Sequence, residues 1–271
     1  MKKPLVTLIL SIIGLYGVSA LENRPAGARS LSLSHAFVSV SDPWSTFHNQ
    51  AGLSAIDHFS AGIFCESKFL VDELSLTAGT IVLPVNKGVF GISFFQFGKS
   101  SYKESNIGLA FAKRLTKNLQ AGIQLDYSSN RFPENSHPFG FVTFEIGAIY
   151  SPNQKLFLGS HVYNPISNGI KTYEGKQKSP IRFRFGGHYQ FNDLVLLSVE
   201  TQKDFKHPLL LKSGIEFLPA KNLALRFGVS GKPFNYTAGF GYVFKKVTTD
   251  IGFGYHGNLG LTPSVSLQVN L

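Results

Sequence analysis

The sequence predicts an all-β fold, an antiparallel transmembrane β-barrel of about 14 strands. Only 15% of its 271 residues are charged, against roughly a quarter in an average soluble domain. From Asp57 onward, large apolar residues alternate with Gly and polar residues, which is the pattern of a strand with two different faces. Short clusters of Asn, Asp, Gly, Pro and Lys separate these segments and are typical of turns.

The first twenty residues are predicted to be a signal peptide. Lys2 and Lys3 precede an apolar run from Leu5 to Val18, and a Val-Ser-Ala sequence ends at Ala20 as a cleavage site. The run is shorter than the roughly 20 residues that a membrane-spanning helix needs, so we prefer export to a membrane anchor. The mature chain would begin near Leu21 with two Lys fewer and a charge of +8, which suits anionic lipid headgroups; nucleic acid is not expected as a partner of an exported chain.

Residues 27–53 carry the most specific pattern in the chain. They read Gly-Ala-Arg-Ser-Leu-Ser-Leu-Ser-His-Ala-Phe-Val-Ser-Val-Ser-Asp-Pro-Trp-Ser-Thr-Phe-His-Asn-Gln-Ala-Gly-Leu. This segment resembles the N-terminal signature of the FadL and PorV/PorQ group of outer-membrane proteins, in which Gly-Ala-Arg, a small-residue run, Ala-Phe-Val, Asp and Asn-Pro-Ala-Gly-Leu follow at this spacing. Two positions depart from it: Ser34-His35 stands where the family commonly has Gly-Gly, and Gln50 replaces the Pro.

The resemblance implies that residues 21–56 fold into the barrel as a plug. The residues suit this role, because Trp44 and Phe47 are large enough to fill a lumen that glycines on the inward face leave partly empty. The alternative is an ordinary first strand and turn in front of a barrel filled only by strand side chains. The plug candidates are Gly27, Arg29, Phe37, Asp42, Trp44, Phe47, Asn49 and Gly52.

Residues 57–271 are predicted to form the barrel. Fourteen segments fit strands of the length that spans a bilayer, about 9–11 residues, joined by turns. The expected strands are 57–67, 71–84, 88–98, 102–115, 118–130, 139–151, 155–164, 179–191, 194–203, 207–218, 222–231, 234–244, 247–256 and 259–271.

The two faces of these strands differ in chemistry. Aromatic residues such as Phe240 occupy one face, and in water this face would form an apolar patch far larger than soluble monomers expose. We therefore assign it to lipid and expect the strand charges on the opposite, inner face. Four acids and four bases interleave with the apolar set, a balance that favours paired interior charges over an ion-conducting path. They are Asp126, Glu145, Arg182, Arg184, Glu200, Lys212, Glu216 and Arg226.

The connections fall into two sets. One set is short, as at 85–87, and the other contains the longer stretches 130–138 and 164–179. Outer-membrane barrels place short turns in the periplasm and long loops outside, so this rule puts both chain ends in the periplasm of a Gram-negative bacterium. Apolar groups in the long loops are candidate partner contacts, although they could equally be solvated loop residues at the headgroup level. The candidates are Phe132, Phe139, Ile170 and Tyr173.

The last strand favours the barrel over the alternative fold, a secreted β-sandwich. Apolar residues alternate with polar ones from Val265 to Leu271, an ending that resembles the insertion signal of outer-membrane barrels. The family pattern usually ends in an aromatic residue, and here the last residue is Leu271.

Catalysis, metals and cofactors find little support. The single cysteine, Cys65, excludes an intramolecular disulfide and a Cys-rich metal site. No Gly-x-Ser-x-Gly elbow and no His-Glu-x-x-His pair is present. The Gly-x-Gly pairs at 239–241 and 252–254 lie inside predicted strands with no helix after them, so they are packing glycines. We expect no enzyme and no cofactor.

Two functional classes remain. The resemblance to PorV/PorQ implies an accessory barrel of the type IX secretion or surface-assembly machinery, acting through other outer-membrane or secretion proteins. The resemblance to FadL implies the alternative, passive transport of small hydrophobic molecules. The short polar loops offer little material for a capture site, so the accessory barrel is the preferred interpretation. Outer-membrane lipid is a partner in either case.

Overall fold

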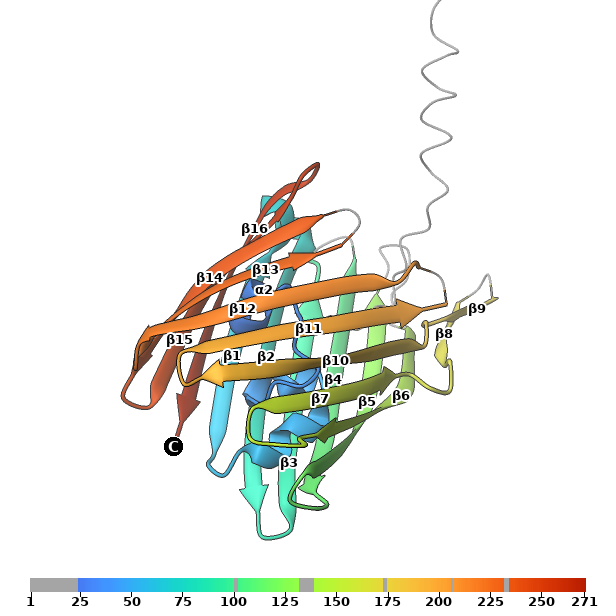
Figure 1. Ribbon diagram of the computed structural model, residues 1–271. Helices are drawn as coiled ribbons and strands as arrows, with labels where there is room; N and C mark the ends of the chain where they lie inside the picture. Colours follow the sequence, from blue (N-terminus) through green and yellow to red (C-terminus); the bar gives the residue numbers. More distant parts are fainter. Residues whose placement is uncertain (1–23, 100–101, 132–138, 173–174, 206, 232–233) are drawn as a thin grey trace, which may run out of the picture.

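The computed structural model describes residues 24–271 except 100–101, 132–138, 173–174, 206 and 232–233, so the predicted signal peptide lies outside the described residues. Fourteen antiparallel strands close into a barrel in which β1 pairs with β16, and the predicted fold class is confirmed (Figure 1). The barrel strands are β1 (Ser60–Ser67), β2 (Ser75–Val85), β3 (Gly88–Phe97), β4 (Lys103–Arg114), β5 (Leu119–Arg131), β6 (Phe139–Tyr150), β7 (Leu156–Tyr163), β10 (Arg182–Asn192), β11 (Val195–Asp204), β12 (Leu210–Ala220), β13 (Leu223–Ser230), β14 (Asn235–Phe244), β15 (Val247–His256) and β16 (Gly260–Asn270).

Two connections differ from the predicted pattern. The stretch 164–179 contains a separate two-stranded hairpin, β8 (Gly169–Thr172) and β9 (Gly175–Lys178), so that β7 pairs directly with β10. The chain between β1 and β2 forms two short 3-10 turns, η3 (Lys68–Leu70) and η4 (Asp72–Leu74), where a strand from residue 71 was expected. Elements of three or four residues are too short for an alternating pattern to show.

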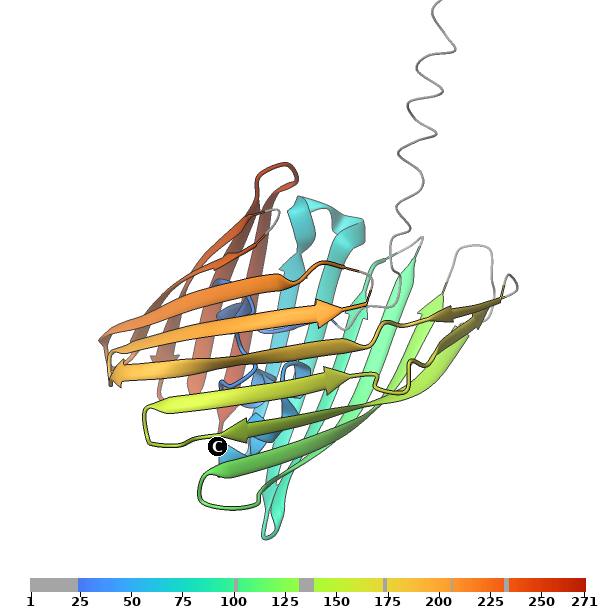
Figure 2. The same cartoon turned by 45° about the vertical axis from the view of Figure 1, so that its right-hand side comes forward.

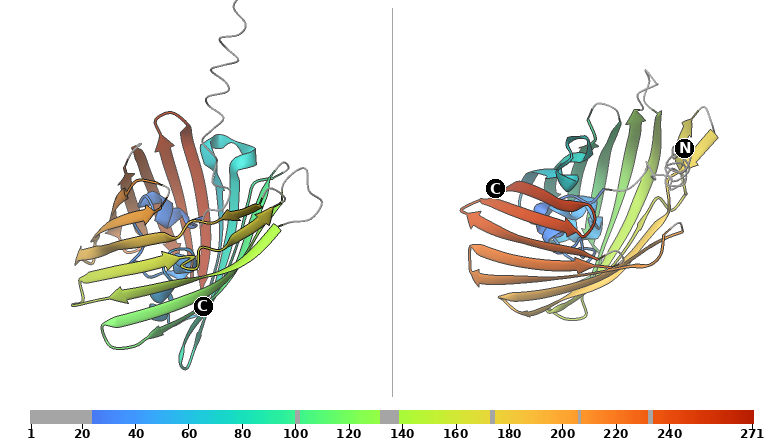
Figure 3. Two further views of the ribbon diagram at one scale, coloured as in Figure 1. Left: turned by 90° about the vertical axis from the view of Figure 1, so that its right-hand side faces the viewer. Right: turned by 90° about the horizontal axis from the view of Figure 1, so that it is seen from above.

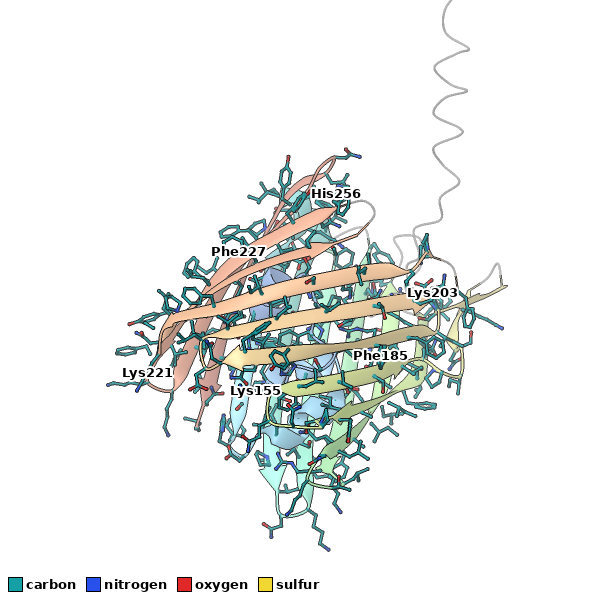
Figure 4. All side chains as sticks on the ribbon, in the orientation of Figure 1. Lys155, Phe185, Lys203, Lys221, Phe227 and His256 are labelled. Atoms are coloured by element: carbon teal, nitrogen blue, oxygen red, sulfur yellow. The ribbon has the colours of Figure 1, made fainter. Side chains whose placement is uncertain are left out.

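The outer wall is apolar, as expected for a face in contact with lipid. Phe185 and Phe227 project from it and are 61% and 62% exposed (Figure 4). Their neighbours Arg184 and Arg226, one residue earlier, point inward and are 6% and 4% exposed. The alternation read from the sequence therefore separates the two faces correctly.

Residues 24–56, which we call the luminal segment, lie inside the ring of strands (Figures 1 and 2). The segment contains one short helix, α2 (Ala28–Ser32), and two 3-10 turns, η1 (Pro43–Phe47) and η2 (Gln50–Ala55). The view from above in Figure 3 shows it surrounded by the wall. Among the described residues, no helix is long and apolar enough to cross a membrane.

The two described ends of the chain lie at opposite ends of the barrel. Arg24 bonds to Glu104 at the start of β4, next to the longer connections, which we call the loop end. Leu271 bonds through its backbone to Phe59, beside the short turns, which we call the turn end. The luminal segment crosses the barrel between these two points, before β1 begins. That both ends of the mature chain lie in the periplasm stays a prediction. The predicted start of the mature chain near residue 21 lies outside the described residues.

Candidate functional site

The luminal segment packs against the wall through close backbone approaches. Gly27 has a φ of +104°, and a Cβ there would lie 2.7 Å from the ring of Trp44. Trp44 is 1% exposed and meets Phe64 of β1 edge-on, with ring centroids 6.0 Å apart. Phe47 lies beside it at 6.2 Å. These aromatic rings fill the lumen next to β1, as their size predicts.

Glycines on the inner wall make room for the segment. A Cβ on Gly252 would lie 2.8 Å from the carbonyl oxygen of Ala28, and one on Gly214 would lie 2.7 Å from Leu33. One glycine of each Gly-x-Gly pair, Gly239 in β14 and Gly252 in β15, packs against the segment, whereas Gly241 faces Asp250 and Arg226 of the wall. Other wall glycines that face the segment are Gly62, Gly91, Gly122, Gly147, Gly159 and Gly228.

The two positions where the family commonly has Gly-Gly adopt left-handed backbone. Ser34 and His35 have φ values of 51° and 57°, a region that glycine enters freely and other residues enter at a cost of about 1 kcal/mol each. Hydrogen bonds offset this cost: the Ser34 amide donates to Thr237 Oγ1 at 3.1 Å, and His35 Nδ1 lies 3.1 Å from Ser30 Oγ.

Asn49 begins the last part of the signature and ties the segment to β6 and β7. Its side-chain amide donates to the carbonyl oxygens of Val38, Ala148 and Ser160, and its oxygen accepts the amide of Ala51. A Cβ on Gly52 would lie 2.7 Å from Ser45 Oγ. Gln50 stands at the first position of η2, where the Pro of the family pattern would fit well.

The first group of interior charges surrounds Glu216. Arg29 of the luminal segment reaches both carboxylate oxygens of Glu216, at 2.7 and 2.9 Å, and contacts Asp42 at 3.2 Å. Arg226 donates through Nε to Glu216 Oε2, the oxygen that also accepts from Arg29 Nε, and binds Asp250 at 2.7 Å. One carboxylate therefore links two arginines, one from the segment and one from the wall.

The second group surrounds Glu200, which is fully buried. Arg184 binds it through Nε at 2.7 Å, and Lys212 binds it at 3.0 Å. Its second oxygen accepts the backbone amides of Phe37 and Val38, both at 2.9 Å. Glu200 thus holds the turn between α2 and η1 against the wall.

The third group is acidic and contains Glu145 and Asp126. Glu145 accepts a hydrogen bond from Gln50 of the luminal segment at 2.7 Å and lies 2.8 Å from His161 Nε2. Asp126 accepts one from Gln124 at 2.9 Å. All eight predicted lumen charges lie buried on the inner face, and Arg182 is placed directly across from Asp204 in the ladder.

Burial and neighbouring charged groups set the pKa values of the ionisable side chains in the luminal segment. Burial alone would lower the pKa of Arg29, but the carboxylates of Glu216 and Asp42 raise it above its ordinary value. Burial raises the pKa of Asp42 to about 6, opposed by Arg29. Arg29 and Asp42 are therefore both charged at neutral pH.

The two histidines of the segment are uncharged at neutral pH. Burial, with Lys212 and Arg184 nearby, lowers the pKa of His35 to about 3. Burial and Arg184 also lower the pKa of His48 well below its usual range. His48 Nε2 donates to the carbonyl oxygen of Ala26 at 2.9 Å, which ties α2 to η1.

The segment divides the described interior into separate cavities. The loop-side cavity has a volume of about 350 Å³ and is bordered by Leu31 and His35. Two turn-side cavities of about 410 and 290 Å³ are both bordered by Arg29 and Glu216. The loop-side cavity shares no lining residue with either of them, so α2 and the residues after it stand between the two ends of the barrel.

Two of the proposed partner residues can be placed. Ile170 is fully buried against Phe141, and Phe139 packs on the same cluster and is half-buried. The expectation that Ile170 offers a contact surface is wrong for this conformation, because hairpin β8–β9 packs its apolar residue inward. Phe132 and Tyr173 lie outside the described residues.

Several residues of the site were not anticipated. Asp250 and His161 join the charge groups, and Glu104 binds Arg24 at 2.9 Å. Asp250 precedes Ile251 in an alternating strand, so its inward position could have been read from the sequence. Its partner could not, because alternation gives the face of a residue but not its neighbours. No cluster that could hold a metal ion is found in the described part of the chain.

Comparisons with known proteins find structures of the same fold but no protein with a matching sequence. No family model matches the chain. No curated protein matches it in sequence either. Among solved structures, the chain resembles the toluene transporter TbuX of Ralstonia pickettii, with a TM-score of 0.69 at 14% identity over 92% of this chain and 99% of that one.

It also resembles a FadL homologue of Pseudomonas aeruginosa, with a TM-score of 0.68 at 13% identity over 92% of this chain and 99% of that one. The chain also resembles the toluene transporter TodX of Pseudomonas putida, with a TM-score of 0.66 at 13% identity over 92% of this chain and 97% of that one. A closed, 14-stranded barrel with an occupied lumen is an outer-membrane fold. The fold of this chain is FadL-like, because it is the fold of the three structures named above. These structures are transporters and a FadL homologue, and none is a protein of PorV/PorQ type.

Proposed function

We propose that this protein lets small hydrophobic molecules cross the outer membrane passively. The observation that carries the proposal is the loop-side cavity, which lies above the luminal segment of a FadL-like barrel. Its volume of about 350 Å³ lies within the range of small-molecule sites. This replaces the accessory barrel as the preferred function, since the solved structures of the same fold named above are transporters and a FadL homologue.

Passage requires the luminal segment to move, because α2 separates the cavities at the two ends. The two parts of the segment are held differently. Residues from Arg29 to Val38 are held by polar contacts, from Arg29 to Glu216 and from Phe37 and Val38 to Glu200, which can exchange with water. The later part shares apolar clusters with β1–β4 through Trp44, Phe47 and Leu53, so we place the movement in the earlier part. The turn end faces the periplasm in this proposal.

The test is flux into liposomes whose outer leaflet is lipopolysaccharide, which slows hydrophobic molecules, because toluene crosses a plain phospholipid bilayer unaided. Ser34 Oγ and Thr237 Oγ1 lie 3.0 Å apart, so a Ser34→Cys, Thr237→Cys pair in a Cys65→Ser background would join the turn after α2 to β14 when oxidised. The reduced protein should speed the entry of toluene and exclude glucose, and oxidation should return toluene entry to the rate of liposomes without protein. Equal rates in empty and protein-containing liposomes of this kind would reject transport.

The second candidate is the PorV/PorQ-type accessory barrel. Its support is the signature at residues 27–53 together with the interrupted lumen. Affinity purification of the tagged protein from its outer membrane in mild detergent, read by native mass spectrometry, distinguishes the two. A stoichiometric protein partner favours the accessory role, and a solitary barrel with a small hydrophobic mass favours transport.

A further inference from the structure

The loop-side cavity has two chemically different ends. The barrel order β3-β2-β1-β16-β15-β14-β13 runs around it as an arc. Apolar side chains border one end, on β2, β3 and α2, and polar side chains border the other, on β14 and β15. The apolar set is Leu31, Leu76 and Phe97, and the polar set is Asn235, Thr237 and His256.

The polar end offers hydrogen bonds that the protein itself does not use. Asn235 and His256 are direct partners in the β14–β15 ladder. Among the described residues, no hydrogen bond of the Asn235 side chain is found. His256 Nδ1 accepts the backbone amides of Asn258 and Leu259, at 3.2 and 3.3 Å, so a neutral ring carries its proton on Nε2 as a donor.

The charges around the cavity are balanced, and Lys68 is the one nearest the polar end: its Nζ lies 6.0 Å from the ring of Phe69, which meets the His256 ring edge-on. Arg24 binds Glu104 and lies 3.6 Å above the ring of Phe97. Glu66 and Lys68 lie between the two ends, on β1 and the turn after it, and have opposite signs. His35, next to the polar end, is uncharged at neutral pH because burial lowers its pKa.

We propose that this cavity binds a small uncharged amphiphile, with a compact apolar body at the β2–β3 end and a hydroxyl or carbonyl head at Asn235 and His256. The proposal rests on the transport function and specifies its substrate class. A plain hydrocarbon would displace water from the amide of Asn235 without replacing its hydrogen bonds. A site built for hydrogen bonding binds a ligand that leaves its polar groups unpaired much more weakly. Among the described residues no ion pair reaches Asn235 or His256, so a charged head placed there would lose its hydration without a counter-ion in direct contact.

The experiment uses four probes that share one ring: toluene, benzyl alcohol, benzoate and benzylamine. Binding to the purified full-length protein in detergent is measured by saturation-transfer NMR titration. Benzyl alcohol should bind about tenfold more tightly than the other three, as one added hydrogen bond predicts. Asn235→Leu should remove this advantage and leave toluene unchanged.

Asn222→Leu is the matched control, because Asn222 borders a turn-side cavity instead, and it should bind all four probes as the native protein does. Tighter binding of toluene or benzoate than of benzyl alcohol overturns the substrate class, as does an Asn235→Leu protein with the native preference. If the protein speeds toluene entry into liposomes while benzyl alcohol does not bind, transport stands and this inference fails. If no probe binds and the protein speeds the entry of none, both fail.

Discussion

At the scale of single residues, Glu216 has a role that its neighbours do not share. It is the only carboxylate that Arg29 and Arg226 both contact among the described residues, while each arginine also has a second acid, Asp42 or Asp250. Loss of Glu216 leaves each arginine paired with its second acid. Loss of Arg29 leaves the Asp42 carboxylate without a cation, and Arg226 then faces both Glu216 and Asp250 alone.

Arg29→Gln should therefore destabilise the protein more than Glu216→Gln. Breaking a buried ion pair costs about 3–5 kcal/mol when a charge is left uncompensated, and we expect Arg29→Gln to approach that range and Glu216→Gln to fall below it. Urea unfolding in lipid vesicles measures both. Lys117→Gln, at an exposed turn, is the control; a larger loss for Glu216→Gln would show that the pairing around Arg29 is misassigned.

A pair of substitutions at His35 tests the left-handed backbone. Alanine and glycine both remove the imidazole, but only glycine removes the unfavourable backbone at φ 57°. His35→Gly should be more stable than His35→Ala by about 1 kcal/mol. The same unfolding assay compares the two proteins, and equal stability would mean that this turn carries no strain.

At the scale of the elements, β14 presents aromatic residues to lipid along its whole length. Phe240 lies in mid-strand and is 41% exposed, whereas Phe244 ends the strand, is 60% exposed and precedes Lys245. Phe240 and Phe244 thus lie on the same face of β14 but at different depths in the membrane.

Phe240→Lys should impair membrane insertion and Phe244→Lys should not. A lipid-facing Lys costs about 2–4 kcal/mol at mid-bilayer but only about 0–1 kcal/mol near the interface. The yield of folded protein in lipid vesicles measures the effect. Normal insertion of Phe240→Lys would mean that β14 faces something other than lipid.

Sequence reasoning recovers the strands because lipid and lumen impose opposite demands on alternate residues. The period-two pattern in β14 or β10 is therefore strong, and the inward place of Arg184 and Arg226 follows from it. It cannot recover hairpin β8–β9, where Ile170 packs on Phe141 through a contact set by the tertiary fold. For the same reason it indicates which charges are interior but not that Glu200 accepts amides from the luminal segment.

At the scale of the whole molecule, the described strands of the barrel form one closed ladder, because β1 pairs with β16 from Ser60 to Glu66. Barrels of this kind resist detergent until heated. The purified protein should migrate at different positions on a gel before and after boiling. Uniform migration, together with full solubility in buffer without detergent, would contradict the barrel.

The seam between β1 and β16 also dictates an order of assembly. The first and last strands of the barrel meet there, so the circle completes only after the final strand is made. The luminal segment precedes β1 and bears Arg29 and Asp42, which bind within the enclosed space. The contacts of the segment reach distant parts of the wall, Glu216 of β12 and Phe64 of β1. We therefore expect the segment to dock on the nascent sheet before the seam between β1 and β16 closes.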